Sequence, residues 1–326
     1  MPSPRAPVII VNPVAGNGRA HHLAPRIEAW LAKRGIEARM LETREAGHAE
    51  RLAAAAADLG HDRIVAVGGD GTIQEVLNGL LAGGAGPDGQ LPSFGIVPGG
   101  SGNDLARGLH LPLSADEALE AALGDETRPL DVGRASHDGA TRYFGAAGGT
   151  GFDAQVAHTM AGHRHRWQRG RAGYFVSTLI ELGRYRNRSL SVRLATDEGA
   201  RQVDGRFLFV AFANGAYYGG GMQICPDART DDGWLDVCLV GDISKLGAMR
   251  ELPGIYRAAH VNHPLVEIVR ARELRLEGEH ETLVHLDGEP FGRLPVDISL
   301  VPDAVAVAAP AAAPADEADG SASVGT

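Results

Sequence analysis

The sequence predicts an α/β protein of two domains, the first a doubly wound parallel sheet and the second mostly antiparallel. Two observations lead to this prediction. Within about the first 110 residues, an apolar strand, a glycine-rich loop and an amphipathic helix follow one another three times, as in parallel sheets covered by helices. Beyond Pro129 the apolar segments become short and strand-like. The chain has 326 residues, which is enough for two hydrophobic cores.

The first unit begins close to the N-terminus. Val8 to Val11 is an apolar, β-branched run typical of a buried strand, and the loop Asn12–Gly18 follows it. A helical pattern comes next, with its larger apolar residues at Leu23, Ile27, Trp30 and Leu31. The second strand ends over residues 41–43, and the alanine-rich stretch 46–59 predicts a further helix.

The second unit, residues 64–80, is the most informative part of the chain. A strand is predicted over residues 64–67, and Gly68, Gly69 and Gly71 allow a sharp turn and the close approach of a ligand. Apolar residues at helical spacing follow at Ile73, Val76, Leu77 and Leu80. Thr72 and Glu75 fit a capping box at the start of this helix. The unit therefore predicts an anion site made of free backbone N–H groups.

Asp70 stands in the middle of this loop, where a phosphate would repel it. A capped turn without a ligand explains the glycines but not this carboxylate. Beside phosphates, a carboxylate is explained if it binds Mg²⁺ or transfers a proton. A third unit follows, with a strand at residues 95–97, the loop Pro98–Asp104 and a helix from Leu105. Because such loops gather at the carboxyl edge of a parallel sheet, the three together predict a nucleotide site.

The second half predicts short strands with two helical insertions. The strand-like segments are Arg142–Ala146, Leu190–Ala195, Phe207–Ala213, Leu235–Val240, Leu274–Leu276 and Thr282–Leu286. The insertions lie near residues 153–187 and 244–260. We therefore expect a first domain over residues 1–129 and a second over 130–303, the last part of which can return to the first. The tail from Ala304 to residue 326 is rich in Ala, Pro, Gly and Asp and is predicted to be disordered.

Charge and composition narrow the class of protein. The formal net charge of −10 argues against nucleic acid as a partner. The sequence lacks a run of about 18 apolar residues that could span a membrane, and the first strand leaves no room for a signal peptide. Cys225 and Cys238 have no metal-type spacing and are predicted to be free, buried thiols in a reducing compartment. A cytoplasmic location follows.

One segment departs from the acidic balance. Between His163 and Arg188 the one acidic residue is Glu181, whereas the segment contains the arginines Arg164, Arg166, Arg169, Arg171, Arg184, Arg186 and Arg188. Apolar residues at helical spacing lie between the arginine groups, and such a segment can dock on anionic lipid headgroups. The alternative is a solvated helix that packs its apolar face on the core. The sequence leaves both readings open, so contact with the inner face of a membrane is an expectation.

The glycine-rich motifs in combination identify a family. They are Asn12-Pro13 with Gly16, the Gly68–Thr72 loop with Glu75 and Asn78-Gly79, Gly99–Asp104, and in the second half Pro226–Asp236 and Leu286–Pro290. Together they resemble the diacylglycerol kinase catalytic domain, and more narrowly the soluble bacterial lipid kinases, which are related to sphingosine kinases and NAD kinases. The resemblance reaches about residue 302. It implies a Rossmann-like first domain, a β-sandwich second domain and a nucleotide in the cleft between them.

The resemblance also implies roles for residues of the first domain. The Gly68–Thr72 loop, with Gly68, Gly69, Asp70, Gly71 and Thr72, would hold the phosphates of ATP together with Asn12 and Gly16. Ser101 would add a hydroxyl near the phosphates, Asn103 and Asp104 would brace the third loop, and Thr43 would touch the nucleotide.

For the catalytic base the resemblance points to Asp287-Gly288-Glu289. Asp287 would hold a water–metal network and Glu289 would accept the proton of the acceptor hydroxyl. Carboxylates on either side of a glycine can point into one cleft, and their repulsion would raise one pKa. Read without the resemblance, Asp-Gly is a common hairpin turn. Asp70 is the rival candidate for the base.

A second Mg²⁺ site is implied around Asp232. In the bacterial branch one Asp carboxylate and two main-chain carbonyls bind the metal, and the matching positions are the Asp232 carboxylate and the carbonyls of Arg229 and Trp234. An all-oxygen site of this kind suits Mg²⁺. The family often has an apolar residue where this chain has Arg229.

These features predict an ATP-dependent lipid kinase that transfers the γ-phosphoryl group to a lipid hydroxyl, with diacylglycerol giving phosphatidic acid as the first candidate. The alternatives are an NAD-kinase-like enzyme acting on a soluble hydroxyl and a lipid-binding homologue without catalysis. The basic segment and the Asp287–Glu289 motif argue against the former, and the acids Asp70, Asp287 and Glu289 against the latter. A homodimer, through pairing of edge strands, is left open.

Overall fold

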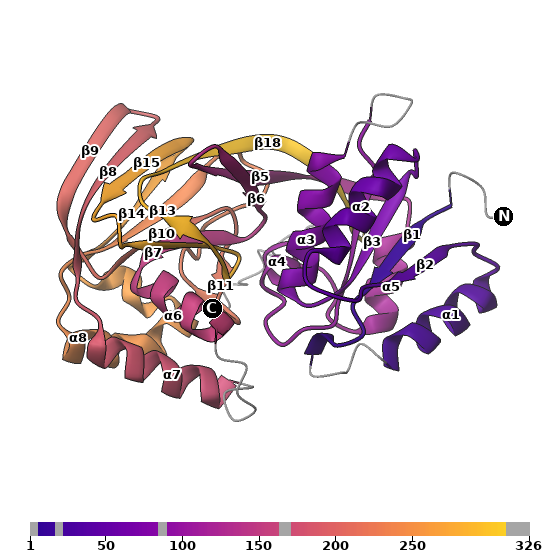
Figure 1. Ribbon diagram of the computed structural model, residues 1–326, viewed down its shortest axis with the longest axis horizontal. Helices are drawn as coiled ribbons and strands as arrows, with labels where there is room; N and C mark the ends of the chain where they lie inside the picture. Colours follow the sequence, from indigo (N-terminus) through magenta and orange to yellow (C-terminus); the bar gives the residue numbers. More distant parts are fainter. Residues whose placement is uncertain (1–5, 17–21, 84–89, 163–170, 311–326) are drawn as a thin grey trace, which may run out of the picture.

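The protein folds into two lobes (Figure 1). The computed structural model describes residues 6–16, 22–83, 90–162 and 171–310. Four parallel strands in the order β2-β1-β3-β4 form the first lobe. Their bounds are Val8–Val11 for β1, Arg39–Glu42 for β2, Arg63–Gly68 for β3 and Ser93–Pro98 for β4.

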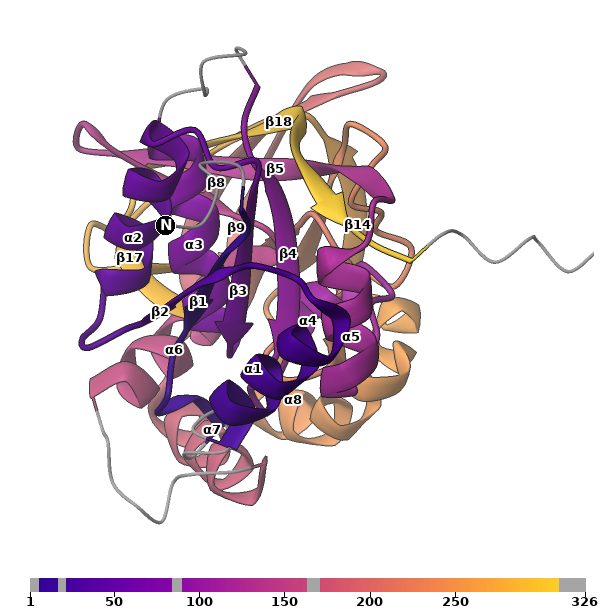
Figure 2. The same ribbon diagram turned by 90° about the vertical axis from the view of Figure 1, so that its right-hand side faces the viewer.

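Helices cover both faces of this sheet (Figure 2). They are α1 Leu23–Arg34, α2 His48–Asp58, α3 Asp70–Ala82, α4 Asp104–Gly108 and α5 Ala115–Leu123. Successive side chains of a strand point to opposite faces. Ile9 and Val11 of β1 accordingly pack with α1 and α5, whereas Val8 and Ile10 pack with α2 and α3. The prediction of a doubly wound domain is confirmed.

The second lobe is a β-sandwich, as predicted. One sheet has the order β14-β13-β10-β7-β16-β17 and is antiparallel. These strands are β7 Ala147–Gly151, β10 Phe209–Ala213, β13 Leu235–Val240, β14 Val266–Ala271, β16 Leu283–Leu286 and β17 Glu289–Arg293. Phe144 and Phe212 meet edge to face between the sheets, with their ring centroids 5.4 Å apart.

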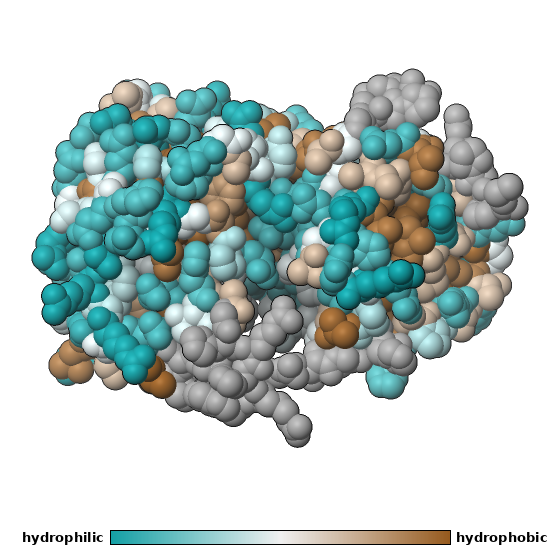
Figure 3. Space-filling model, in the orientation of Figure 1, coloured by the Kyte–Doolittle hydropathy of each residue, from teal (hydrophilic) through white to brown (hydrophobic). Residues whose placement is uncertain are grey.

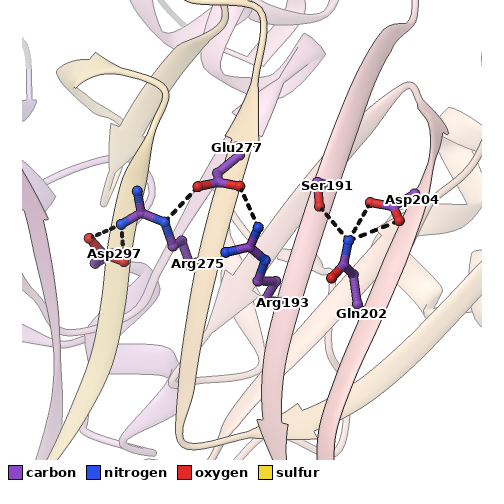
Figure 4. A network of polar contacts seen from close by, with 7 residues as sticks. All are labelled: Ser191, Arg193, Gln202, Asp204, Arg275, Glu277 and Asp297. Carbon is purple, nitrogen blue, oxygen red and sulfur yellow. Dashed lines mark hydrogen bonds and ion pairs between the residues drawn. The ribbon is translucent and has the colours of Figure 1, made fainter.

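The opposing sheet continues the parallel sheet of the first lobe. It contains β5 Thr127–His137, β6 Ala140–Phe144, β8 Arg188–Thr196, β9 Gly199–Phe207, β15 Glu273–Gly278 and β18 Val296–Ala308. Its outer face carries a ladder of charges, in which Arg275 pairs with Asp297 and Glu277, and Glu277 pairs with Arg193 (Figure 4). Exposed pairs of this type contribute little to stability, about 0–1 kcal/mol each.

Strand β18 corrects the predicted start of the tail. The sequence assigns residues from Ala304 to a disordered tail, yet 304–308 are part of β18, and Val307 pairs in parallel with Phe94 of β4. Val305 and Val307 are 2% and 0% exposed in the core of the first lobe. The alternation of Ala and Val was the strand signal, and the high alanine content hid it. Residues 311–326 lie outside the described residues.

The predicted helical insertions are confirmed. They contain α6 Phe152–Gly162, α7 Arg171–Arg184 and α8 Lys245–Glu251, which is followed by the 3₁₀ segments Leu252–Arg257 and Ala259–Asn262. They cover the outer face of the six-stranded sheet, and a short hairpin, β11 Tyr217–Tyr218 with β12 Met222–Gln223, lies beside them. Cys225 and Cys238 are free and buried there, as expected. None of the helices among the described residues is long and apolar enough to cross a bilayer.

Candidate active site

The three glycine-rich loops meet at the carboxyl edge of the parallel sheet. They line a cleft of about 550 Å³ that the Asp287–Glu289 turn of the second domain completes. Of the predicted site residues, the lining includes Asn12, Gly16, Thr43, Gly69, Asp70, Gly71, Thr72, Ser101, Asp287 and Glu289. Gly68 and Asn103 do not line it. Gly68 ends β3, and Asn103 braces the third loop because its Oδ1 accepts the Gly100 N–H at 3.1 Å.

The first and second loops are joined by side chains. Asn12 Nδ2 donates to Thr72 Oγ1 at 2.9 Å. The predicted capping box is wrong, because neither partner caps α3. Instead the Glu75 carboxylate accepts the N–H groups of Gly47 at 2.8 Å and Ala49 at 3.0 Å, and so caps the neighbouring helix α2. Among the described residues no side chain caps α3, and its first residues, Asp70, Gly71 and Thr72, line the cleft, which is the arrangement of an anion site at a helix N-terminus.

Asp70 joins the second loop to the third. Its carboxylate accepts the N–H of Asn103 at 2.9 Å and of Asp104 at 2.7 Å, at the start of α4. Burial raises the pKa of Asp70, and these two hydrogen bonds oppose the rise. The carboxylate thus fixes the spacing of the second and third glycine-rich loops. Both of its oxygens accept hydrogen bonds.

Asp104 carries the connection on to the second domain. Its carboxylate accepts the N–H groups of Gly220 and Gly221, each at 2.8 Å, in the turn between β11 and β12. Burial, together with the charge of Asp70, raises the pKa of Asp104 to about 7. From the sequence alone Asp104 has only a local role in the third loop, because its partners lie 116 and 117 residues away.

This raised pKa predicts a pH dependence of stability. Because the folded protein binds a proton that the unfolded chain releases, the free energy of unfolding should fall as the pH rises from about 4 to about 7. In Asp104→Asn the decrease in the free energy of unfolding over this pH range should be smaller, by on the order of 1 kcal/mol for each unit of pKa shift. Thermal melting of both proteins across this range measures it. Parallel melting curves would contradict the prediction.

The Asp287-Gly288 turn is both a hairpin turn and part of the cleft. Both residues have positive φ, +49° and +84°, as a two-residue turn requires. The Asp287 carboxylate accepts the N–H groups of Gly145 at 2.9 Å and of Ala146 and Ala147 at 3.0 Å. The pKa of Asp287 is raised to about 6, mainly by burial and in smaller part by the charge of Asp70. The expected repulsion between the two carboxylates of the motif is therefore not the main cause.

Glu289 lies at the mouth of the cleft over the start of α3. It is exposed, and its Oε1 is 3.2 Å from the position that a Cβ would take on Gly71. A carboxylate thus lies above the loop whose N–H groups face the cleft. An anionic group bound at that loop and a hydroxyl beside Glu289 would be neighbours.

Comparison with known proteins agrees with this geometry. Residues 6–135 match the diacylglycerol kinase catalytic domain, and residues 146–309 match the YegS C-terminal NAD kinase beta sandwich-like domain. The chain belongs to the diacylglycerol kinase family of bacterial lipid kinases. A diacylglycerol kinase of Mycobacterium tuberculosis is 35% identical over 303 residues, 92% of this chain and 94% of that protein.

Other relatives of this kinase give the same result. A protein named "Probable lipid kinase YegS-like" from Chromohalobacter salexigens is 33% identical, over 89% of this chain and 85% of its own length. The crystal structure of a diacylglycerol kinase from Bacillus anthracis superimposes with a TM-score of 0.72 at 28% identity, and covers 94% of this chain and 97% of that one. The resemblance found in the sequence is confirmed.

Two residues of the kinase that sequence reasoning missed clamp α3 to the second domain. Gln74 Nε2 donates to the Leu286 carbonyl at 2.9 Å, directly before the Asp287–Glu289 turn. Asn78 pairs with the Tyr143 backbone through two hydrogen bonds of 2.9 Å. Asn78 belongs to the quoted family motif, but only the fold brings it to a partner 65 residues away.

The predicted Mg²⁺ site around Asp232 is apart from the cleft and stays a prediction. Asp232 Oδ1 accepts the Trp234 N–H at 3.1 Å, and its other oxygen pairs with Arg270. The Arg229 side chain pairs with Asp231 at 3.2 Å. A cation at Asp232 would therefore compete with the Arg270 guanidinium for this carboxylate.

Proposed function

We propose that this kinase transfers the γ-phosphoryl group of ATP to a lipid hydroxyl, with diacylglycerol as the first candidate and phosphatidic acid as its product. The observation that carries the proposal is that the glycine-rich Gly69–Thr72 loop and Glu289 line the same cleft. The names of the relatives, diacylglycerol kinase and lipid kinase, support the choice of acceptor.

The predicted site residues of the cleft have proposed parts in the transfer. The Gly69–Thr72 loop, with Asn12 and Gly16, binds the phosphates through backbone N–H groups and short polar side chains. Ser101 and Thr43 border the nucleotide. Glu289 accepts the proton of the lipid hydroxyl while the hydroxyl oxygen forms a bond to the γ-phosphorus. The bond between the γ-phosphorus and the oxygen of the β-phosphate breaks, and ADP leaves.

Mg²⁺ is the proposed companion of ATP. Asp70 and Asp287 border the cleft beside the phosphate loop, and carboxylate oxygens are ligands that Mg²⁺ prefers. A carboxylate has about four lone-pair sites, so the N–H groups that these two accept leave room for a cation. When bound, the ion would neutralise phosphate charge in a cleft where these acids lie close together. The chain itself binds and orients the phosphates and positions the base.

Transfer of labelled phosphate from ATP to lipids in mixed micelles, with NAD in a parallel tube, tests the proposal. Labelled phosphatidic acid would support it, and a different labelled lipid would support the kinase with another acceptor. Labelled NADP would instead support the NAD-kinase-like alternative. If no acceptor is labelled, the proposed catalysis is wrong.

We also propose a cytoplasmic enzyme that contacts the membrane through the Arg164–Arg188 segment. Residues 163–170 lie outside the described residues, as do the side chains of 171–177. In the described part Arg184 and Arg186 are exposed, whereas Arg188 pairs with Glu279. The surface over α7 and α8, at the lower left of Figure 3, shows hydrophobic side chains, and it lies on the side toward which β3 and β4 run in Figure 2. Among the described side chains of these helices, Ile180, Leu246 and Met249 are 43%, 59% and 45% exposed.

Acidic residues on this face should weaken membrane binding. Changing Leu246 and Met249 to Glu should reduce co-sedimentation with phosphatidylglycerol vesicles about tenfold, because the two side chains lose apolar contact and repel the headgroups. Leu113→Glu, at a position 43% exposed in the first lobe, is the control. Equal sedimentation of all three proteins would contradict the membrane proposal, while turnover of a short-chain diacylglycerol in solution reports on catalysis separately.

A further inference from the structure

A buried histidine–aspartate pair lies behind the catalytic turn and has no part in the chemistry above. His285 is on β16, two residues before Asp287, and Asp153 is in the first turn of α6. Their side chains are 3% and 7% exposed, and His285 Nε2 lies 3.3 Å from Asp153 Oδ2. Burial raises the pKa of Asp153, and the hydrogen bond with His285 opposes the rise. Since burying two polar side chains is costly and such a pair is weak evidence for stability, the pair invites a functional explanation.

The second ring nitrogen of His285 contacts the turn itself. His285 Nδ1 accepts the N–H of Gly288 at 3.3 Å. In a neutral imidazole one nitrogen accepts and the other donates. Acceptance at Nδ1 therefore places the proton on Nε2, which faces Asp153. The aspartate fixes the orientation of the ring, and the ring fixes the Gly288 peptide.

The surrounding strands fix the place of the His285 side chain. The β16–β17 register shifts between Val284 and His285, which marks a bulge at the histidine. Gly149 of β7 lies opposite His285, and a Cβ there would be 1.9 Å from Asp153 Oδ2. The Tyr218 ring stacks on His285, with centroids 6.2 Å apart and planes 23° apart. The histidine thus has one well-defined position.

We propose that His285 is a positioning residue that holds the Asp287–Glu289 turn, through Gly288, in the geometry for phosphoryl transfer, with Asp153 fixing its ring. The Gly288 N–H belongs to the peptide that joins Asp287 to Gly288, one residue before Glu289, so the orientation of this peptide sets the course of the backbone into Glu289. The catalytic consequence rests on the proposed role of Glu289, whereas the contact itself does not. A misplacement of about 1 Å in such a group can cost about 100-fold in rate.

Two substitutions separate the two hydrogen bonds of the ring. In His285→Asn the side-chain oxygen replaces Nδ1 and keeps the Gly288 bond, while in His285→Gln the amide nitrogen replaces Nε2 and keeps the Asp153 bond. We expect His285→Gln to lower kcat about 10- to 100-fold with little change in the KM for ATP, and His285→Asn to recover most of that loss. His158→Leu is the matched control, because His158 of α6 contacts the Val284 carbonyl of the same strand at 3.0 Å. It should lower the melting temperature without this loss of kcat.

Amide hydrogen exchange gives a readout that needs no substrate. The Gly288 amide should exchange faster in His285→Gln than in the wild type, and at a rate near the wild type in His285→Asn. Unchanged exchange in His285→Gln would overturn the proposal, as would equal losses of kcat in both variants in step with their melting temperatures. If the wild type labels no acceptor, the proposed function fails, while the exchange rates still decide the contact.

Discussion

Asp70→Asn is expected to reduce phosphoryl transfer on the order of 10³-fold. The carboxylate accepts the N–H groups of Asn103 and Asp104 on separate oxygens. An amide can accept with only one, so its NH₂ group would face an N–H of the third loop. The spacing of the two loops and the negative charge for Mg²⁺ would both be lost. Steady-state turnover with labelled ATP and diacylglycerol measures the effect.

Asp116→Asn is the control for this variant. Asp116 is also in the first turn of a helix, but its side chain is 54% exposed and pairs with Arg26 outside the cleft. Wild-type turnover in Asp70→Asn would rule out both its structural and its metal role. Because both oxygens of Asp70 are engaged with the third loop, the geometry favours Glu289 over Asp70 as the base.

Glu289→Gln should lower kcat by about 10²- to 10⁴-fold and leave ATP affinity almost unchanged. Glutamine keeps the size of the side chain but cannot accept the proton of the acceptor hydroxyl. Because Glu289 is exposed at the mouth of the cleft, the substitution should leave the fold and the phosphate loop intact. Calorimetric titration with ATP and single-turnover kinetics separate binding from chemistry.

Glu281→Gln provides the comparison on the same hairpin. Glu281 precedes β16 and pairs with Arg293 at 2.6 Å, away from the cleft lining. Its turnover should match that of the wild type. If Glu289→Gln lost ATP affinity and kept kcat, the carboxylate would be a nucleotide ligand and the assignment as base would be wrong.

Local patterns in the sequence were enough to predict the parallel sheet and the cleft loops. Val8–Val11 is a strand with the predicted bounds, and the loops after β1, β3 and β4 meet because parallel strands end at one edge. The resemblance to a family added the Asp287–Glu289 turn, which a hairpin signal alone does not distinguish from an ordinary turn. Its place in the cleft depends on a partner domain that periodicity does not describe.

Contacts between distant segments could not be predicted in this way. Glu75 has the spacing of a capping box, yet the neighbouring helix α2 offers its own free N–H groups, and tertiary packing decided between them. Gln74 and Asp104 are polar residues on otherwise ordinary helices, and their partners are set only by the docking of the two domains. The pairing of Asp153 with His285 also spans 132 residues.

Strand β18 has a consequence for the order in which the chain acquires its structure. A ribosome completes the nucleotide lobe's first four strands early, but the segment that pairs with the edge of β4 and adds Val305 and Val307 emerges only after the whole sandwich has been synthesised. Until then β4 presents unpaired backbone groups, which can recruit a chaperone or another nascent chain. The two lobes are therefore expected to mature together rather than one after the other, and a fragment ending before residue 304 should be prone to aggregation.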